Sequence, residues 1–399
     1  MLTFLPSSRI VSGFFCLLVA SLLSPANCVY AKSELEGLRI GASEKGTRVV
    51  VELTEKVKYK IFTLSNPYRV VIDLSDVEWV NQKRLPDGAG LIQNIRKGLF
   101  SSNVMRIVMD TTGPINIKRD FILPPSAGFP YRMVVDLEKT SLAEFNKDLA
   151  SQRANAQPEA NPPPVIKPVK KNDKFVVVID AGHGGVDPGA SGKKVLEKNI
   201  VLAFAKELAA ELRRDNRYEV HLTRDRDIYI PLRGRVNIAR RHSADLFISI
   251  HADAIGRKNV RGMSIYTLSE TASDKEAAAL ARKENRSDIL AGIDFGDQPK
   301  EVTNILIDLA QRETKNLSVK FASTVVSQMK GNTILLDRTH RFAGFRVLKA
   351  PDVPSVLIEL GFLTNSRDEK QLRSAKWRKT VAQALKQSID TFSKSLANN

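Results

Sequence analysis

Residues 175–185 decide the fold of the larger part of this chain, and they read Phe175-Val176-Val177-Val178-Ile179-Asp180-Ala181-Gly182-His183-Gly184-Gly185. A run of five apolar residues this rich in valine predicts a strand that is buried on both faces. The glycines after the strand let the backbone turn sharply and leave the imidazole of His183 uncovered. We therefore expect a buried sheet with a polar side chain at the end of this strand.

The pattern recurs further along the chain. Residues 246–250 form a second apolar run, and His251 follows it directly. Residues 218–222 and 356–360 also predict strands, and residues 200–214 predict a helix. Near-continuous apolar strands joined by helices predict an α/β domain whose mostly parallel sheet is covered by helices on both faces. Ligands bind at the carboxyl ends of the strands in such folds.

Two glutamates join these histidines in the predicted fold. Glu197 opens the helix after the first strand, and Glu359 ends an otherwise apolar strand, where a carboxylate is costly unless something pairs with it. Two His and one Glu supply three protein ligands for Zn²⁺ and leave the fourth tetrahedral position to water, as in catalytic sites. We expect His183, Glu197 and His251 to hold the metal and Glu359 to act as the base.

Taken singly, each of these residues has an ordinary structural explanation. A histidine at a strand end is usually structural, and a glutamate at a helix start is favoured by the helix dipole. Their convergence on one edge of the predicted sheet favours a site. The other histidines, His221 in a strand, His242 on a helix and His340 in a loop, lack this context.

Residues 175–392 resemble the zinc-dependent N-acetylmuramoyl-L-alanine amidases that split septal peptidoglycan. The matching motifs are Ile179-Asp180-Ala181-Gly182-His183-Gly184-Gly185, Glu197-Lys198-Asn199, Thr223-Arg224 with Asp227, Ser249-Ile250-His251-Ala252-Asp253, and Leu348-Lys349-Ala350-Pro351-Asp352-Val353-Pro354-Ser355-Val356-Leu357-Ile358-Glu359. The resemblance implies that His183, Glu197 and His251 are zinc ligands and that Glu359 is catalytic. The sequence departs from the family pattern at none of these four positions.

The reaction implied by the resemblance is hydrolysis of the amide between N-acetylmuramic acid and L-alanine, which separates daughter cells. Zinc in such a site lowers the pKa of its bound water toward about 7, and Glu359 would carry the proton to the leaving amine. The residues alone indicate only metal-assisted hydrolysis. Two alternatives therefore stay open: a zinc peptidase acting on stem peptides, and an inactive cell-wall-binding scaffold.

An acidic insertion spans about residues 269–313, between a strand and a helix that we expect to begin near Thr314. Ser273 and Glu276 form a capping box, which predicts a helix from Glu276 to Asn285. In related division amidases a helix in this region covers the active site and lends zinc an extra ligand until an activator with a LytM domain displaces it. The same autoinhibition is expected here. Glu270 is the first candidate for the blocking carboxylate, Glu276 the second and Glu284 the third; the alternative is a solvated helix with ordinary surface acids.

The N-terminal part contains an internal repeat. One copy runs from Leu38 to Leu74 and the other from Ile95 to Leu137. Within each copy, β-branched residues alternate with polar ones, as in Val49-Val50-Val51-Glu52-Leu53, which predicts about three half-buried strands. Two such units can share a core as an all-β sandwich over residues 32–140. This stretch resembles the AMIN domain, which implies attachment to the cell wall and localisation to the division site.

The N-terminus reads as an export signal. An apolar run from Ile10 to Leu23 ends before Val29-Tyr30-Ala31, so residues 1–31 predict a cleaved signal peptide and a periplasmic protein. The alternative is a membrane anchor, but an uninterrupted span needs about 20 apolar residues. Both cysteines, Cys16 and Cys28, lie in this segment. The mature chain therefore has no thiolate to offer a metal.

Residues 141–174 form a linker rich in proline, which favours extended conformations, and the zinc amidase domain follows over residues 175–396. A short helix from Leu142 to Ala154 is possible within the linker. The formal charge of +17 favours an anionic polymer as partner. For an exported protein we expect peptidoglycan rather than nucleic acid, and we expect a monomer.

Overall fold

The computed structural model describes residues 32–44, 46–79, 85–155, 174–293 and 305–397. The predicted signal peptide, much of the predicted linker and part of the acidic insertion lie outside these residues. Among the helices of the described part, none is long and apolar enough to cross a membrane.

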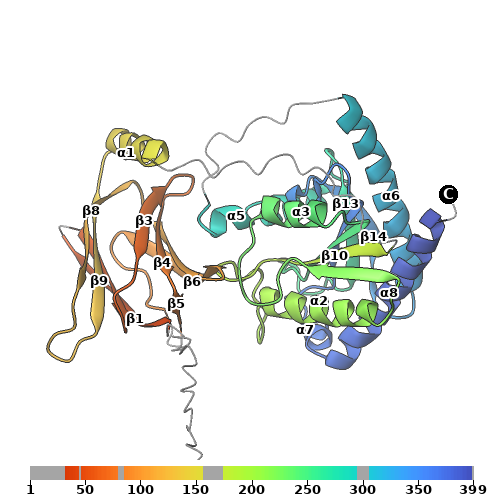
Figure 1. The fold of residues 1–399 in the computed structure, drawn as a ribbon, viewed down its shortest axis with the longest axis horizontal. Helices are drawn as coiled ribbons and strands as arrows, with labels where there is room; N and C mark the ends of the chain where they lie inside the picture. The colour runs from red at the N-terminus through yellow and green to blue at the C-terminus, as the bar shows by residue number, and fades with distance from the viewer. Residues whose placement is uncertain (1–31, 45, 80–84, 156–173, 294–304, 398–399) are drawn as a thin grey trace, which may run out of the picture. The chain divides into compact units, whose positions relative to one another are not determined.

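The described N-terminal part is mostly strand (Figure 1). One sheet has the order β5-β1-β2-β9-β8 and the other the order β3-β4-β7-β6. Val49, Val51 and Leu53 are buried while Arg48 is exposed, so the predicted alternation is present. The inner faces share one apolar core, which confirms the β-sandwich. The strands are β1 (Ser33–Ser43), β2 (Gly46–Leu53), β3 (Tyr59–Leu64), β4 (Arg69–Ser75), β5 (Val77–Glu78), β6 (Ile92–Ser101), β7 (Val104–Thr111), β8 (Ile115–Leu123) and β9 (Tyr131–Lys139).

The two copies of the repeat pair their strands with each other, which the sequence did not reveal. Strand β2 of the first copy pairs with β9 of the second, and β4 of the first pairs with β7 of the second. Each sheet therefore contains strands from both copies. Equivalent ion pairs join the copies: Arg48 Nε lies 2.6 Å from Asp136 Oδ1, and Arg106 Nε lies 2.6 Å from Asp73 Oδ1. Neither copy can complete a sheet alone.

Helix α1 (Leu142–Asn155) follows the sandwich, close to the bounds expected for the short helix at the start of the linker. Beyond it, the C-terminal part is organised around one sheet with the strand order β11-β10-β12-β15-β13-β14. Neighbouring strands run parallel except where β13 pairs antiparallel with β15. The predicted mostly parallel sheet is thus confirmed. Its strands are β10 (Phe175–Ala181), β11 (Tyr218–Leu222), β12 (Leu246–His251), β13 (Met263–Leu268), β14 (Leu335–Ala343) and β15 (Ser355–Glu359).

Helices cover both faces of this sheet (Figure 1). Val177 and Ile179 of β10 face the core that contains α2 (Glu197–Arg213), α6 (Ile305–Met329) and α8 (Ala375–Ala397). Val176 and Val178 face α3 (Leu232–Arg241) and α4 (Lys275–Glu284). The shorter elements are α5 (Ser287–Leu290), α7 (Ser366–Leu372) and the 3₁₀ turn η1 (Arg346–Leu348). The apolar run at 175–179 is therefore explained by burial on both sides.

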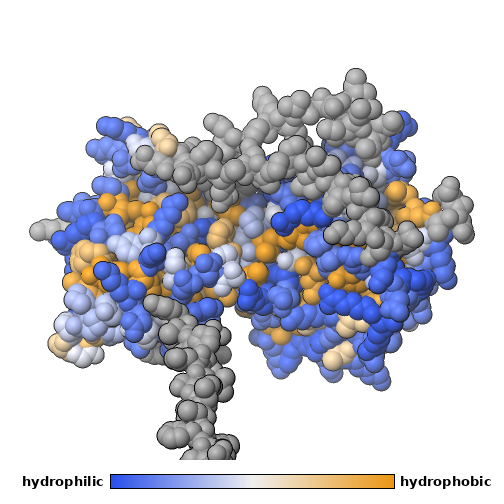
Figure 2. Space-filling view, viewed as in Figure 1, coloured by the Kyte–Doolittle hydropathy of each residue, from blue (hydrophilic) through white to orange (hydrophobic). Residues whose placement is uncertain are grey.

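Figure 2 shows that hydrophilic side chains cover most of the visible surface of the C-terminal part. The large apolar residues that are exposed there, Leu290, Val319, Ile334 and Phe342, are scattered along the sequence. Scattered apolar residues of this kind are ordinary on protein surfaces.

Three local expectations need correction. Asp274, not Ser273, caps α4, because its carboxylate accepts the Ala277 amide at 2.9 Å. Helix α6 begins at Ile305, before the expected start near Thr314. His340 lies in strand β14 rather than in a loop. The capping error follows from adjacent residues that are both good N-caps.

Candidate metal centre

The four residues singled out in the sequence come together at the carboxyl end of the sheet. His183 lies in the loop after β10, and His251 and Glu359 are the last residues of β12 and β15. Glu197 is the first residue of α2. All four are buried, and both carboxylates are fully so. A buried cluster of two imidazoles and two carboxylates needs a compensating partner.

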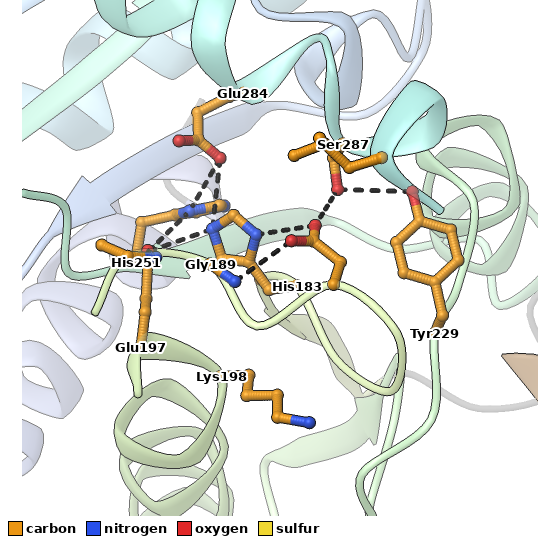
Figure 3. Close-up of polar contacts among 12 residues, drawn as sticks. His183, Gly189, Glu197, Lys198, Tyr229, His251, Glu284 and Ser287 are labelled. Atoms are coloured by element: carbon orange, nitrogen blue, oxygen red, sulfur yellow. Dashed lines mark hydrogen bonds and ion pairs between the residues drawn. The ribbon is translucent and has the colours of Figure 1, made fainter. Parts of the chain in front are cut away.

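A third carboxylate, Glu284 at the end of α4, completes the cluster (Figure 3). His183 Nε2 lies 3.2 Å from Glu197 Oε1 and 3.3 Å from Glu284 Oε2. His251 Nδ1 lies 3.2 Å from each of the same two oxygens. Each of these two oxygens thus lies within 3.3 Å of both histidine nitrogens.

These four distances fit a tetrahedral zinc ion. Ligand bonds of about 2.0–2.1 Å place tetrahedral donors about 3.3–3.4 Å apart, which is close to the observed 3.2–3.3 Å. His183 Nε2 has no hydrogen-bond partner among the described residues although it is buried. The ligand atoms of His183, His251 and Glu284 all lie within 4.8 Å of one another. The donor set therefore suits a nitrogen- and oxygen-preferring divalent cation.

Of the three candidate carboxylates in the insertion, the first two lie away from the histidines. Glu270 is exposed after β13, and Glu276 is exposed and pairs with Arg257 at 3.0 Å. Glu284, the third candidate, is the one that reaches the histidines. A signal in the sequence could have found it, because Glu284 continues the buried stripe of α4 formed by Ala277, Leu280 and Ala281. A carboxylate at a core-facing helical position implies a partner.

Asp187 is a further site residue that the sequence reasoning missed. Its Oδ2 lies 2.8 Å from His183 Nδ1, so it fixes the ring and leaves Nε2 facing the cluster. A carboxylate behind a histidine is the usual orienting partner in metal sites. Ser287 of α5 donates a hydrogen bond to the same carboxylate. The insertion therefore touches both the cluster and the residue that orients it.

Buried arginines fix the backbone of the His183 loop. Arg235 donates to the His183 carbonyl at 2.8 Å and pairs with Asp180 at 2.8 Å. Arg224, from the Thr223-Arg224 motif, donates to the Gly182 carbonyl at 2.8 Å. The arginines thus provide hydrogen bonds to loop carbonyls that strand pairing would satisfy in a sheet.

Gly189 is required by close packing as well as by its backbone. Its φ is +67°, and a Cβ there would lie 2.6 Å from His183 Cδ2 and 2.7 Å from Glu197 Oε2. Any larger residue would push into both side chains. The loop from His183 to Glu197 is thus built around the cluster.

The electrostatics follow from burial and close charges. Burial lowers the pKa of His183, but the charges of Glu197, Asp187 and Glu284 outweigh it and raise that pKa well above its ordinary value. Burial raises the pKa of Glu284, as the histidines only partly offset it. A divalent cation among these groups would balance the negative charge.

Glu359 occupies a separate position beside the donors. It is the register partner of His251 on the neighbouring strand. Its Oε2 accepts the Asp253 amide at 2.9 Å, whereas Oε1 is buried and has no hydrogen-bond partner among the described residues. Burial, followed by the charges of Asp253, Glu197 and Glu284, raises its pKa well above the ordinary value. Such a carboxyl is suited to accept and return a proton.

Comparisons with known proteins show what the chain is similar to. The family model for N-acetylmuramoyl-L-alanine amidase matches residues 177–391, and the model for the AMIN domain matches residues 37–120. The chain is 35% identical to the N-acetylmuramoyl-L-alanine amidase AmiC of Escherichia coli O6:H1 over 91% of this chain and 90% of that protein. It is 33% identical to AmiC of Neisseria meningitidis over 93% of each chain. Among solved structures, the catalytic domain of the amidase CwlV from Paenibacillus polymyxa is 28% identical, with a TM-score of 0.40, over 55% of this chain and 98% of that one.

Proposed function

The chain belongs to the N-acetylmuramoyl-L-alanine amidase family, and we propose that it is a zinc-dependent member whose resting state is closed by its own insertion. Its substrate is the amide between N-acetylmuramic acid and L-alanine in peptidoglycan. The observation that carries the proposal is that each of the two histidine nitrogens lies 3.2–3.3 Å from an oxygen of Glu197 and from an oxygen of Glu284.

His183, Glu197 and His251 would hold the metal. Glu197 is fixed independently of any ion, because its Oε1 accepts the Ala252 amide at 2.9 Å and its Oε2 accepts the Ala190 amide at 2.7 Å. When bound, zinc supplies Lewis acidity, which activates water and polarises the scissile carbonyl. Preformed ligands lose little entropy when the ion enters.

Glu359 moves the proton in the proposed reaction. Its Oε1 takes a proton from the attacking water, and the same atom returns that proton to the leaving amine of the alanine. The Asp253 amide keeps Oε2 in place during both transfers. Burial raises the pKa of this carboxyl above its ordinary value, in the direction that general acid–base catalysis near neutral pH requires.

Glu284 provides the proposed inhibition. A catalytic zinc site keeps its fourth position for water or substrate. In this conformation Glu284 Oε2 lies 3.3 Å from His183 Nε2 and 3.2 Å from His251 Nδ1, where it would take that position. The helix that carries it lies over the site in Figure 3. Substrate can bind only after α4 has moved away.

Contacts on both sides of Glu284 hold the insertion closed. Lys283 pairs with Asp253, and Ser287 donates to Asp187. The hydroxyl of Tyr229 donates to Asp288 at 2.7 Å, and the Leu232 amide donates to the same carboxylate at 2.9 Å. We call Lys283, Ser287, Asp288 and Tyr229 the latch. An activator that binds the insertion must break these contacts.

The proposal includes where in the cell the enzyme acts and what activates it. Export to the periplasm, recruitment to the division septum through the AMIN domain and release by a LytM-domain protein together describe an enzyme that splits septal wall only where its activator is present. The net charge of +17 supports attraction to the carboxylates of the wall.

Digestion of purified sacculi tests the reaction. The protein with its activator should release intact stem peptides with an N-terminal alanine, identified by mass spectrometry. Glu359→Gln should retain zinc and lose at least about 10²-fold in rate, the usual contribution of a general base. Stem peptides cut internally would indicate a peptidase instead, and no product despite bound zinc and activator would indicate a scaffold. Full activity of Glu359→Gln would refute the assigned role.

A further inference from the structure

A second cluster of metal-binding side chains lies away from the candidate centre. Glu219, His221 and His242 each offer one ligand atom, and these atoms lie within 4.8 Å of one another. Glu219 and His221 belong to β11, the edge strand of the sheet, and His242 directly follows α3. Four of the five histidines in the sequence therefore occur as two pairs, each with at least one carboxylate beside it.

The sheet register brings these side chains to one face. Glu219 pairs with Val176 and His221 with Val178, and those valines face the core that contains α3. Residues two apart on a strand point to the same side. The end of α3 then places the His242 ring on His221, with centroids 3.6 Å apart and an interplanar angle of 17°.

A carboxylate lies directly beside the stacked rings. His221 Nε2 lies 2.8 Å from Glu219 Oε1. One carboxylate and two imidazoles suit Zn²⁺, Ni²⁺ or Cu²⁺ and offer little to Mg²⁺ or Ca²⁺.

We propose that Glu219, His221 and His242 form a second, surface site for a divalent transition-metal ion, which ties the end of α3 to the edge strand β11. The rings must splay from their stack to converge on one ion. The partial exposure of the side chains of His221 and Glu219, 27% and 37%, leaves room for that movement. The remaining coordination positions face solvent, so the site binds more weakly than the buried one. The proposal does not depend on the function of the buried centre.

Zinc stoichiometry tests the proposal. The tag-free full chain, stripped of metal and dialysed against Zn²⁺, should bind two equivalents. His242→Ala should bind one and keep full amidase activity, and His251→Ala should also bind one. His340→Ala is the matched control, because His340 lies on β14 and contacts Thr267; it should bind two.

A thermal measurement separates a built site from adventitious binding. Excess Zn²⁺ beyond the first equivalent should raise the melting temperature of wild type, as any ligand of the native state does, and should leave that of His242→Ala unchanged. Zinc stoichiometries and melting temperatures that are the same in wild type, His221→Ala and His242→Ala would overturn the proposal.

Discussion

The Oε2 atom of Glu284 lies 3.2 Å from Nδ1 of His251, although the two residues come from different elements, helix α4 and strand β12. Glu284 is buried and helical, yet nothing in the sheet needs a carboxylate at that position. Its place is explained if it supplies the fourth ligand of a zinc ion. The same side chain then both binds the metal and inhibits the enzyme. Removing it should relieve the inhibition and leave the other three ligands to hold the metal.

Glu284→Ala should activate the full chain in the absence of any activator. Losing one zinc ligand destabilises the closed state relative to the open state. Each 1.4 kcal/mol of that destabilisation raises the population ratio of open to closed molecules about tenfold. We expect at least about a tenfold rise in dye release from labelled sacculi. Glu276→Ala is the matched control on the same helix, because Glu276 is exposed and pairs with Arg257; its rate should equal that of wild type.

Tyr229→Phe should activate more weakly. It removes only the hydroxyl that donates to Asp288, and a hydrogen bond to a charged group contributes about 1.5–3 kcal/mol. The Leu232 amide still donates to Asp288. We therefore expect a basal rate above that of wild type and below that of Glu284→Ala. Tyr218→Phe, which loses a contact with Asp390, should leave the basal rate unchanged. Equal basal rates for Tyr229→Phe and wild type would show that Tyr229 does not help to hold the insertion closed.

Gly189→Ala should weaken zinc binding. The added Cβ would lie 2.6 Å from His183 and 2.7 Å from Glu197, and the positive φ adds strain. We expect a lower zinc content after dialysis at limiting zinc, with the sandwich unaffected. Gly256→Ala is the control, since a Cβ there meets nothing within 4 Å. Equal zinc content in both variants would contradict the packing argument.

Acid should destabilise the sandwich through Asp136. The hydrogen bond from Arg48 holds the pKa of Asp136 at about 2, below its ordinary value. A carboxyl with a depressed folded-state pKa adds stability above the unfolded-state pKa and loses it as pH falls through the folded-state value. The Asp136 contribution should therefore vanish between about pH 4 and pH 2.

Asp136→Asn should flatten that part of the stability profile in chemical unfolding. Asp120→Asn, on the neighbouring strand β8, is a comparison that removes a carboxylate without breaking the Arg48 pair. Parallel profiles for wild type and Asp136→Asn below pH 4 would show that this ion pair is not responsible.

The sequence predicted the fold class because its signals are local. Apolar runs such as 175–179 and alternation such as 49–53 follow directly from burial on two faces or one. Both family resemblances are confirmed by the comparisons. The exchange of strands between the repeat copies was beyond reach, because pairing such as Arg48 with Asp136 depends on long-range topology.

The candidate site could be predicted where its residues lie at the ends of regular elements. His183, Glu197, His251 and Glu359 sit at element ends that periodicity locates, and they lie together in the structure. Glu284 was ranked below Glu270 and Glu276 because the orientation of an inserted helix depends on what it packs against. Asp187 was missed because a carboxylate in a glycine-rich loop has many ordinary roles.

The most direct test of the account is a crystal structure of the zinc-loaded full chain, with anomalous diffraction collected at the zinc edge. The account predicts one buried zinc bound by His183 Nε2, His251 Nδ1, Glu197 and Glu284, with α4 in the position described above. The absence of zinc from this buried cluster, or a zinc bound there by the two histidines and Glu197 with Glu284 turned away in the absence of activator, would contradict it.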